Sequence, residues 1–284
     1  MKSRSRTYRA FPGLTFRVMD RFDDFAQCVE LQRETWGRDW TDVIPPSMLK
    51  VSQQVGGILG GAFDAGGRLL GFVFGLTGFM HGKPAHWSHQ LAVTQAHRNS
   101  GLGRQLKLYQ RELLVAGKIR VMFWTYDPLV ARNAHLNLNR LGARIHDYVP
   151  DFYKGETSSE MHSGVGTDRF VVRWELNSAR TRRALAGKPV TDYSRYSESP
   201  VIGLGGQSAR TPTRVPAHPP DRVRIEVPDD ILTIQRTDLD LAWKWRVATR
   251  SAFVDHLKRG WQVDGIYRDT AAHVSYYVML KGKR

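Results

Sequence analysis

The chain has 284 residues, a formal net charge of +15 at pH 7, 41% hydrophobic residues and a single cysteine. This length exceeds the usual size of one domain, so we expect either one large domain with an extension or two domains. No apolar run approaches the roughly twenty residues of a membrane span, and the basic N-terminus lacks the apolar segment of a secretory signal. A lone Cys28 excludes an intramolecular disulfide and a cysteine-ligated zinc cluster. We therefore expect a cytoplasmic protein with no membrane partner and no metal.

The positive charge has two interpretations, a nucleic-acid surface or a polyanionic substrate. The sequence contains no zinc finger, no aromatic RNA-binding strand and no evident helix-turn-helix. Nucleic-acid binding therefore ranks below a polyanionic small molecule.

Hydrophobic periodicity predicts strands and helices in the order β-α-α-β-β-β-α-β-α-β-β from residue 15 to residue 176. Asp23 or Asp24 is the expected cap of the first helix, and Gly142 is expected to end the last one. The predicted strands cover residues 15–19, 57–63, 69–76, 87–93, 119–126, 143–148 and 169–176, and the predicted helices cover 25–36, 47–55, 104–116 and 129–141.

The C-terminal part differs in composition. Residues 177–221 are rich in Ser, Thr, Pro, Gly and Arg, which predicts a linker or a surface excursion. Residues 222–284 predict a small α+β extension whose large apolar side chains are packed. Its expected elements are a strand at 223–227, a helix at 238–258, and strands at 261–267 and 273–280.

One segment joins an apolar strand to a helix through a glycine loop. Arg98, Gly101 and Gly103 form the pattern R-x-x-G-x-G. A helix N-terminus has unpaired N–H groups and a partial positive charge, so this arrangement is typical of phosphate binding. The spacing differs from that of the G-x-x-x-x-G-K-[ST] loop and of the G-x-G-x-x-G dinucleotide turn.

This loop and the order of the elements around it resemble the GCN5-related N-acetyltransferase (GNAT) superfamily, which uses acetyl-CoA. Residues 89–93, 124–129 and 133–143 also resemble a subset of bacterial predicted acetyltransferases. The resemblance covers residues 1–176 and implies a mixed α/β fold, with a central twisted sheet flanked by helices. Residues 177–221 and 222–284 are then the linker and the extension.

The resemblance also implies where acetyl-CoA, or another acyl-CoA, is bound. The strand before the loop would hold the pantetheine arm, and the loop amides would hold the pyrophosphate. Arg98, Arg104 and Lys107 could reach phosphate oxygens, and Asn133 is expected to contact the pantetheine. The cofactor-binding residues are thus Leu91, Ala92, Val93, Arg98, Asn99, Ser100, Gly101, Leu102, Gly103, Arg104 and Asn133.

His89 is the expected general base, because a histidine titrates near neutral pH and this one lies on the strand expected to hold the thioester. Alternation puts His89 on the same face as Trp87 and Leu91, and puts His86, Ser88 and Gln90 on the other. The superfamily's usual acid is a Tyr on the later helix, where this chain has Leu138. The candidate replacements are Tyr109, Tyr126, Tyr148, His135 and Tyr153, of which Tyr153 is our choice.

The predicted activity is transfer of an acetyl group from acetyl-CoA to an amine, by direct attack and without a covalent enzyme intermediate. A small-molecule amine is the expected acceptor, and a homodimer is a further expectation. The first alternative is a catalytically silent module that binds CoA, and a nucleic-acid-binding protein ranks last.

Overall fold

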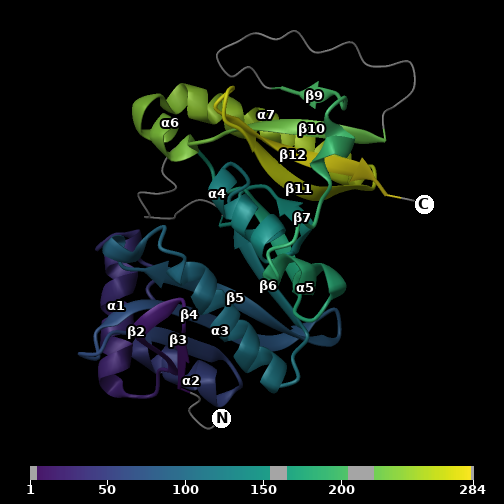
Figure 1. The fold of residues 1–284 in the computed structure, drawn as a ribbon. Helices are drawn as coiled ribbons and strands as arrows, with labels where there is room; N and C mark the ends of the chain where they lie inside the picture. Colours follow the sequence, from purple (N-terminus) through teal and green to yellow (C-terminus); the bar gives the residue numbers. More distant parts are fainter. Residues whose placement is uncertain (1–4, 154–164, 204–220, 283–284) are drawn as a thin grey trace. The chain divides into compact units, whose positions relative to one another are not determined.

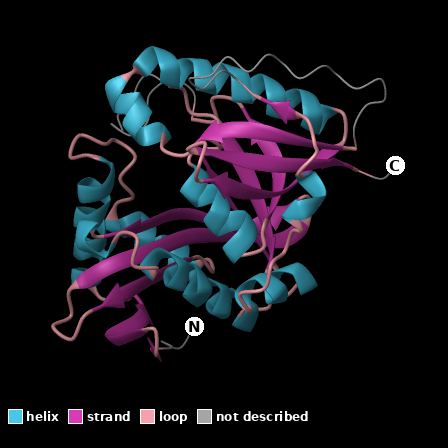
Figure 2. Cartoon of the chain, turned by 45° about the horizontal axis from the view of Figure 1, so that its top comes forward, coloured by secondary structure: helices cyan, strands magenta, loops and turns pink. Residues whose placement is uncertain are grey.

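The computed structural model describes residues 5–153, 165–203 and 221–282. They form two compact units, one of the described residues up to Trp124 and one of those from Thr125 onward (Figure 1). Each unit combines helices with β-strands (Figure 2). None of the helices in these ranges is long and apolar enough to cross a membrane.

The first unit is built on a mostly antiparallel sheet. Its first five strands follow one another in chain order, each antiparallel to the next, and the sixth lies parallel to the fifth. The sixth strand continues into the second unit. These strands are β1 (Arg6–Tyr8), β2 (Phe11–Val18), β3 (Ile58–Phe63), β4 (Leu69–Met80), β5 (Lys83–Val93) and β6 (Val121–Tyr126).

Helices pack on both faces of this sheet. On one face, α1 (Phe22–Trp36) and α2 (Pro46–Gln54) cover an apolar core that includes Leu59 of β3. On the other lies α3 (Leu102–Ala116), so close to β3 that a Cβ on Gly60 would come within 3.0 Å of the Tyr109 ring. Adjacent residues of one strand thus face different helices, as the pleat requires.

The start of α1 corrects the predicted cap. The helix begins one residue after Arg21, and Asp24 occupies its third position instead of capping it. The Asp24 carboxylate accepts hydrogen bonds from the backbone N–H of Arg21 (3.2 Å) and from both terminal nitrogens of Arg17 (2.6 and 2.7 Å). Burial alone would raise the pKa of Asp24, but these donors outweigh it and the pKa lies below its ordinary value.

The second unit contains a smaller sheet of order β11-β12-β10-β9 and the antiparallel pair of β7 with β8, the last two strands of the sheet to which β6 belongs. Only β9 and β10 run parallel in the smaller sheet. The strands are β7 (Arg144–Val149), β8 (Arg169–Glu175), β9 (Val201–Ile202), β10 (Arg222–Pro228), β11 (Trp261–Asp269) and β12 (Val274–Lys281). The helices are α4 (Ala131–Ala134), α5 (Ala179–Leu185), α6 (Ile231–Thr237) and α7 (Leu239–Lys258), with a π-helical turn at His135–Arg140 and a 3-10 turn at Tyr193–Tyr196.

Aromatic rings form the core of this unit. Phe253 of α7 lies 4.7 Å from the ring of Phe170 and 5.1 Å from that of Tyr277, measured between centroids. The prediction that the C-terminal extension buries its large apolar side chains is confirmed for Trp245, Phe253, Trp261, Tyr276 and Tyr277. It is wrong for Trp243, which is 45% exposed.

The predicted fold class is confirmed: a mixed α/β structure with a mainly antiparallel sheet flanked by helices and a small second sheet near the C-terminus. Periodicity missed short elements, namely β1, α5, β9 and α6. It also ended β4 at Leu76 and began β5 at Trp87, whereas the two strands extend to a turn at His81 and Gly82. Residues 177–221, predicted as a linker, contain α5 and β9, and residues 204–220 lie outside the described part.

We predict that Asp24→Asn lowers the free energy of unfolding at pH 7 by about 2 kcal/mol or more, because Arg17 loses its buried carboxylate partner. The pKa of Asp24 is depressed in the fold, so its contribution is present above the unfolded pKa and is lost as pH falls through the folded pKa. Urea unfolding at several pH values measures both effects. Asp23→Asn is the matched control, since its side chain is 78% exposed; equal losses in both variants would contradict the assignment.

Candidate functional site

The glycine loop predicted from the sequence lies where expected, between β5 and α3. Asn99 (φ 63°) and Gly101 (φ 88°) both adopt left-handed backbone conformations, and Gly101 is the N-terminal cap of α3. Ser100 Oγ donates to the carbonyl of His97 (2.8 Å) and accepts from the N–H of Leu102 (3.3 Å). Local hydrogen bonds therefore fix the loop in a turned conformation ahead of the helix.

The predicted cofactor-binding residues of this segment differ in accessibility. Arg98, Asn99, Ser100 and Gly101 are exposed, so the loop is open to a ligand. Along β5 and the first turn of α3 the remaining predicted residues are buried or half-buried. These are Leu91, Ala92, Val93, Leu102, Gly103 and Arg104.

The strand before the loop separates from its parallel neighbour. β5 pairs with β6 at two positions only, His86 with Met122 and Trp87 with Phe123. On its other edge β5 stays paired with β4 as far as Val93. Residues 88–93 therefore have one edge that no described strand of the first unit covers, and its backbone N–H and C=O groups are available to a ligand.

A β-bulge marks the start of this uncovered stretch. Phe74 of β4 pairs with Gln90 and the adjacent Gly75 pairs with Ser88, so His89 is the extra residue. The predicted alternation is confirmed, since His89 is exposed while Ser88 and Gln90 are buried. Partial desolvation, with the ring 6.2 Å from that of Phe74, lowers the pKa of His89, and Asp42 opposes this. The imidazole is therefore mainly neutral at pH 7 and able to accept a proton.

On the buried face of β5, a lysine lies inside the protein. Lys107 of α3 is 6% exposed, and its Nζ donates to Ser88 Oγ (2.6 Å). Ser88 Oγ in turn donates to Gln110 Oε1 (2.9 Å). Burial lowers the pKa of Lys107 to about 7.

The chain of hydrogen bonds continues from Gln110 through His86. Thr77 Oγ1 donates its single hydrogen to the carbonyl of Gly56 (2.7 Å), so it must accept from His86 Nδ1–H (3.0 Å). His86 Nε2 is then the acceptor for the Gln110 amide (3.0 Å). Burial, aided by the charge of Lys107, lowers the pKa of His86 to about 3. His86 is therefore neutral near pH 7, and these hydrogen bonds require the tautomer with its hydrogen on Nδ1.

Two polar groups on this face lack ordinary partners. Neither the amide oxygen nor the amide nitrogen of Gln90 has a hydrogen bond within the described residues, although the side chain is 5% exposed. Besides Ser88, the Lys107 ammonium contacts the Sδ of Met122 (4.0 Å) and the ring of Trp124 (4.3 Å to its centroid), which are weak acceptors. Buried polar groups without partners are rare, so each of these calls for a physical explanation.

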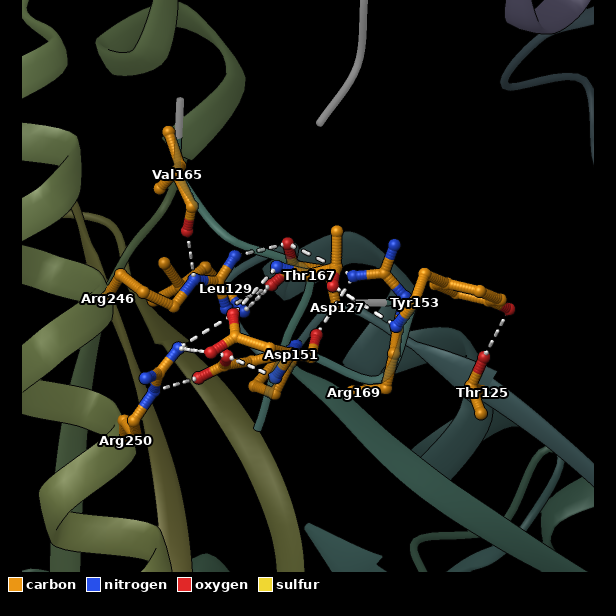
Figure 3. A network of polar contacts seen from close by, with 12 residues as sticks. Thr125, Asp127, Leu129, Asp151, Tyr153, Val165, Thr167, Arg169, Arg246 and Arg250 are labelled. Carbon is orange, nitrogen blue, oxygen red and sulfur yellow. Dashed lines mark hydrogen bonds and ion pairs between the residues drawn. The ribbon is translucent and has the colours of Figure 1, made fainter. Parts of the chain in front are cut away.

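In the second unit, a network of ion pairs surrounds Asp127 (Figure 3). The buried guanidinium of Arg246 donates to both Asp127 oxygens (2.9 and 2.5 Å) and, through Nε, to the carbonyl of Val165 (2.9 Å). Asp127 Oδ1 also accepts from the N–H of Leu129 (2.9 Å), and Arg169 lies 3.8 Å from Oδ2. The end of β6 is thus attached to α7.

The same network positions Tyr153, the predicted acid (Figure 3). Its hydroxyl lies 3.3 Å from Thr125 Oγ1, and the Arg169 guanidinium lies 5.2 Å from its ring centroid. Its N–H donates to Thr167 Oγ1 (3.2 Å), and Arg250 of α7 binds the nearby Asp151 (3.0 Å). Tyr153 is half-buried, with its phenol beside a hydroxyl and a cation.

Leu138, which stands where the resemblance predicts a Tyr, has no proton to donate. Leu138 is fully buried within the π-helical turn. Asn139 holds that turn by donating to the carbonyl of Ile266 (2.7 Å) and accepting from the Tyr193 hydroxyl (2.8 Å). Asn133, the other predicted cofactor contact in this unit, is exposed.

Sequence reasoning misplaced Lys107. It was named as a side chain that could reach phosphate oxygens, but its ammonium is buried against Ser88 Oγ. The available signal was spacing, since Lys107, Gln110 and Leu114 recur at helical intervals beside the apolar stripe of α3. Within residues 5–153, 165–203 and 221–282, no group of three or more His, Cys, Asp or Glu could hold a metal ion.

No family model and no curated protein matches the chain. Solved structures match residues amounting to somewhat more than half of it. They include yncA of Salmonella typhimurium with its cofactor acetyl-CoA (18% identity, TM-score 0.46, 58% of this chain and 95% of that one) and a GNAT-family acetyltransferase of Streptococcus pneumoniae (18%, 0.44, 56% and 98%). A third is aminoglycoside 6'-acetyltransferase type Ii (18%, 0.45, 57% and 97%).

The buried ammonium gives a test of the site's electrostatics. Since the pKa of Lys107 falls to about 7 in the fold, between pH 7 and 9 the unfolded chain binds a proton that the native chain does not. Stability therefore rises with pH in that window, by about 1.4 kcal/mol per pH unit from this group. We expect Lys107→Met to remove this slope in urea unfolding, and the exposed Lys83→Met to retain it; parallel curves for wild type and Lys107→Met would show that Lys107 titrates normally.

Proposed function

We propose that this chain is an N-acyltransferase that moves an acetyl group from acetyl-CoA to an amine of a small-molecule acceptor by direct attack. The observation that carries the proposal is the departure of β5 from β6 after Trp87, immediately before the loop that leads into α3. An uncovered strand edge suits an extended ligand that contains amide groups, because such a ligand can pair with it as another strand would.

The residues present fit acetyl-CoA. Its pantetheine arm contains two amides, which match the buried and unpartnered amide of Gln90 beside the uncovered edge. Its phosphates match the exposed loop of Arg98 to Gly101 at the N-terminus of the 15-residue helix α3. In this proposal Leu91, Ala92 and Val93 line the arm, residues 98–104 hold the pyrophosphate, and Asn133 is a further contact.

The chemistry needs a base for the attacking amine and an acid for the leaving thiolate. His89 suits the base, because its ring is exposed, its pKa is lowered and it lies at the bulge where the strands part. Tyr153 is the candidate acid in the second unit, where its phenol lies beside Thr125. When bound, acetyl-CoA supplies the activated acyl group.

The alternative is a module that binds CoA without catalysis. The burial of Leu138, where the superfamily has a phenol, favours it. Both proposals require CoA binding, and only the first requires release of free thiol from acetyl-CoA when a panel of amines is supplied. The homodimer and the small-molecule acceptor stay predictions, and nucleic-acid binding rests on charge alone.

We predict that acetyl-CoA at about 100 times its Kd stabilises the protein by about 2.7 kcal/mol, which raises Tm by several degrees. Replacing Gly101 and Gly103 together by Val should abolish this shift, because a side chain at φ 88° distorts the loop and a Cβ at residue 103 comes within 3.3 Å of Leu91. Gly67→Val is the control, since it imposes similar strain (φ 80°) in a distant turn. A folded double variant with a normal shift would contradict the phosphate site.

We predict that His89→Ala lowers kcat by about a hundredfold while the Kd for acetyl-CoA is unchanged, as expected for loss of a general base. Wild-type activity should fall on acidification through the lowered pKa of His89, and the variant should lack this limb. Thiol release measured from pH 5 to 8 tests this, with the exposed His81→Ala as the control. An active variant with the wild-type profile would remove His89 from the mechanism.

A further inference from the structure

The hydrogen-bonding capacity of Lys107 is only partly used. Its ammonium has three N–H donors, and Ser88 Oγ is its one strong acceptor within the described residues. Among the described residues no carboxylate contributes to its surroundings, which are Ser88 and His86 from β5, Met122 and Trp124 from β6, and Gln110 from its own helix. His86 is the titratable neighbour, and it stays neutral near pH 7 because its pKa is about 3.

The position of Ser88 is equally specific. It is the first residue of β5 beyond the last pair with β6, so it lies where the two strands part. Gln90, with its unpartnered amide, follows two residues later on the same buried face. The polar side chains with unused hydrogen-bonding capacity therefore lie at the end of the uncovered edge that begins with Ser88.

We infer that Ser88, with Lys107 behind it, donates the proton that the sulfur of CoA receives when the acetyl group leaves. The inference rests on the proposed function and identifies an acid for it in the first unit. The C–N bond to the acceptor amine forms and the C–S bond breaks, while the amine's proton passes to His89. The Ser88 hydroxyl proton passes to sulfur, an ammonium proton of Lys107 replaces it, and neutral Lys107 later regains a proton from water.

The hydrogen-bond chain makes this role possible. Lys107 donates to Ser88, and Ser88 donates to Gln110, so every proton along this part of the chain points away from the ammonium. When the Ser88 hydroxyl rotates, its hydrogen can leave Gln110 and be donated to another acceptor. Lys107 Nζ already donates to Ser88 Oγ, so it can supply the proton that replaces the one lost. A short bond to a cation also makes the hydroxyl a better proton donor.

The test uses CoA itself, so that no acceptor needs to be known. The thiol of bound CoA is titrated by the ultraviolet absorbance of its thiolate, and binding is measured separately by calorimetry. A hydroxyl that donates to the sulfur stabilises the thiolate, and the thiolate in turn favours the protonated form of Lys107. We therefore expect the pKa of the bound thiol to lie about 1 or more below that of free CoA. Ser88→Ala and Lys107→Met should return it to the free value, and Ser88→Thr should keep it low.

Two controls separate proton donation from a structural effect. Thr77→Val breaks the same chain at its far end and should leave the thiol pKa low. Tyr153→Phe should do the same, because its phenol belongs to the other candidate acid. The inference is overturned if the thiol pKa stays low in Ser88→Ala. It is also overturned if Thr77→Val or Tyr153→Phe raises the thiol pKa as much as Ser88→Ala does. In either case CoA binding, and with it the proposed function, can still hold. If the wild-type protein does not bind CoA, the proposed function fails and the inference fails with it.

Discussion

The parting of β5 from β6 is the constraint on which the rest of the first unit depends. A strand in the interior of a sheet must satisfy its backbone on both edges, and β5 does so on one edge only beyond Trp87. The bulge at His89 increases the local twist and turns β5 away from its neighbour. Beyond Trp87, the backbone groups on the β6 side of β5 therefore need a partner other than a strand. At the point where the two strands part, α3 brings Lys107 and Gln110 to the Ser88 side chain.

The sequence predicted most of what local physics determines. The long helices, the strands β3 and β4, and the loop at Gly101 follow from periodicity and from backbone conformations that glycine favours. Alternation even placed His86, Ser88 and Gln90 on one face. What the sequence could not supply is register: the two-residue pairing of β5 with β6 depends on contacts between segments far apart in the chain. Lys107 was misassigned for the same reason, since only tertiary packing shows that its side chain points inward.

The second unit is organised by charge where the first is organised by strand pairing. Arg246 and Arg250 lie one helical turn apart on α7, and between them they bind Asp127, Asp151 and Asp168. Buried ion pairs add little to the free energy of unfolding compared with apolar packing. Removing one partner is costly, however, so conformations of the second unit that separate these pairs are disfavoured. The ion pairs hold the segments around Tyr153 in place through a helix about a hundred residues further along the chain. The pattern of apolar residues in α7 does not predict these ion pairs, because it predicts that Arg246 faces solvent.

The hydrogen bonds from Lys107 to Gly56 all donate in one direction, and this affects which groups of the site can titrate. His86 accepts at Nε2 and donates at Nδ1, so a second proton on the ring would face the N–H of Gln110. The Gln110 amide would then have to flip, which would turn its nitrogen toward Ser88 and leave the serine hydroxyl without its acceptor. The cost of that rearrangement adds to the cost of burying a charge, in keeping with the low pKa of His86, about 3. Near neutral pH the chain therefore has one direction, and Lys107, whose pKa of about 7 leaves both charge states populated, is the member whose protonation changes.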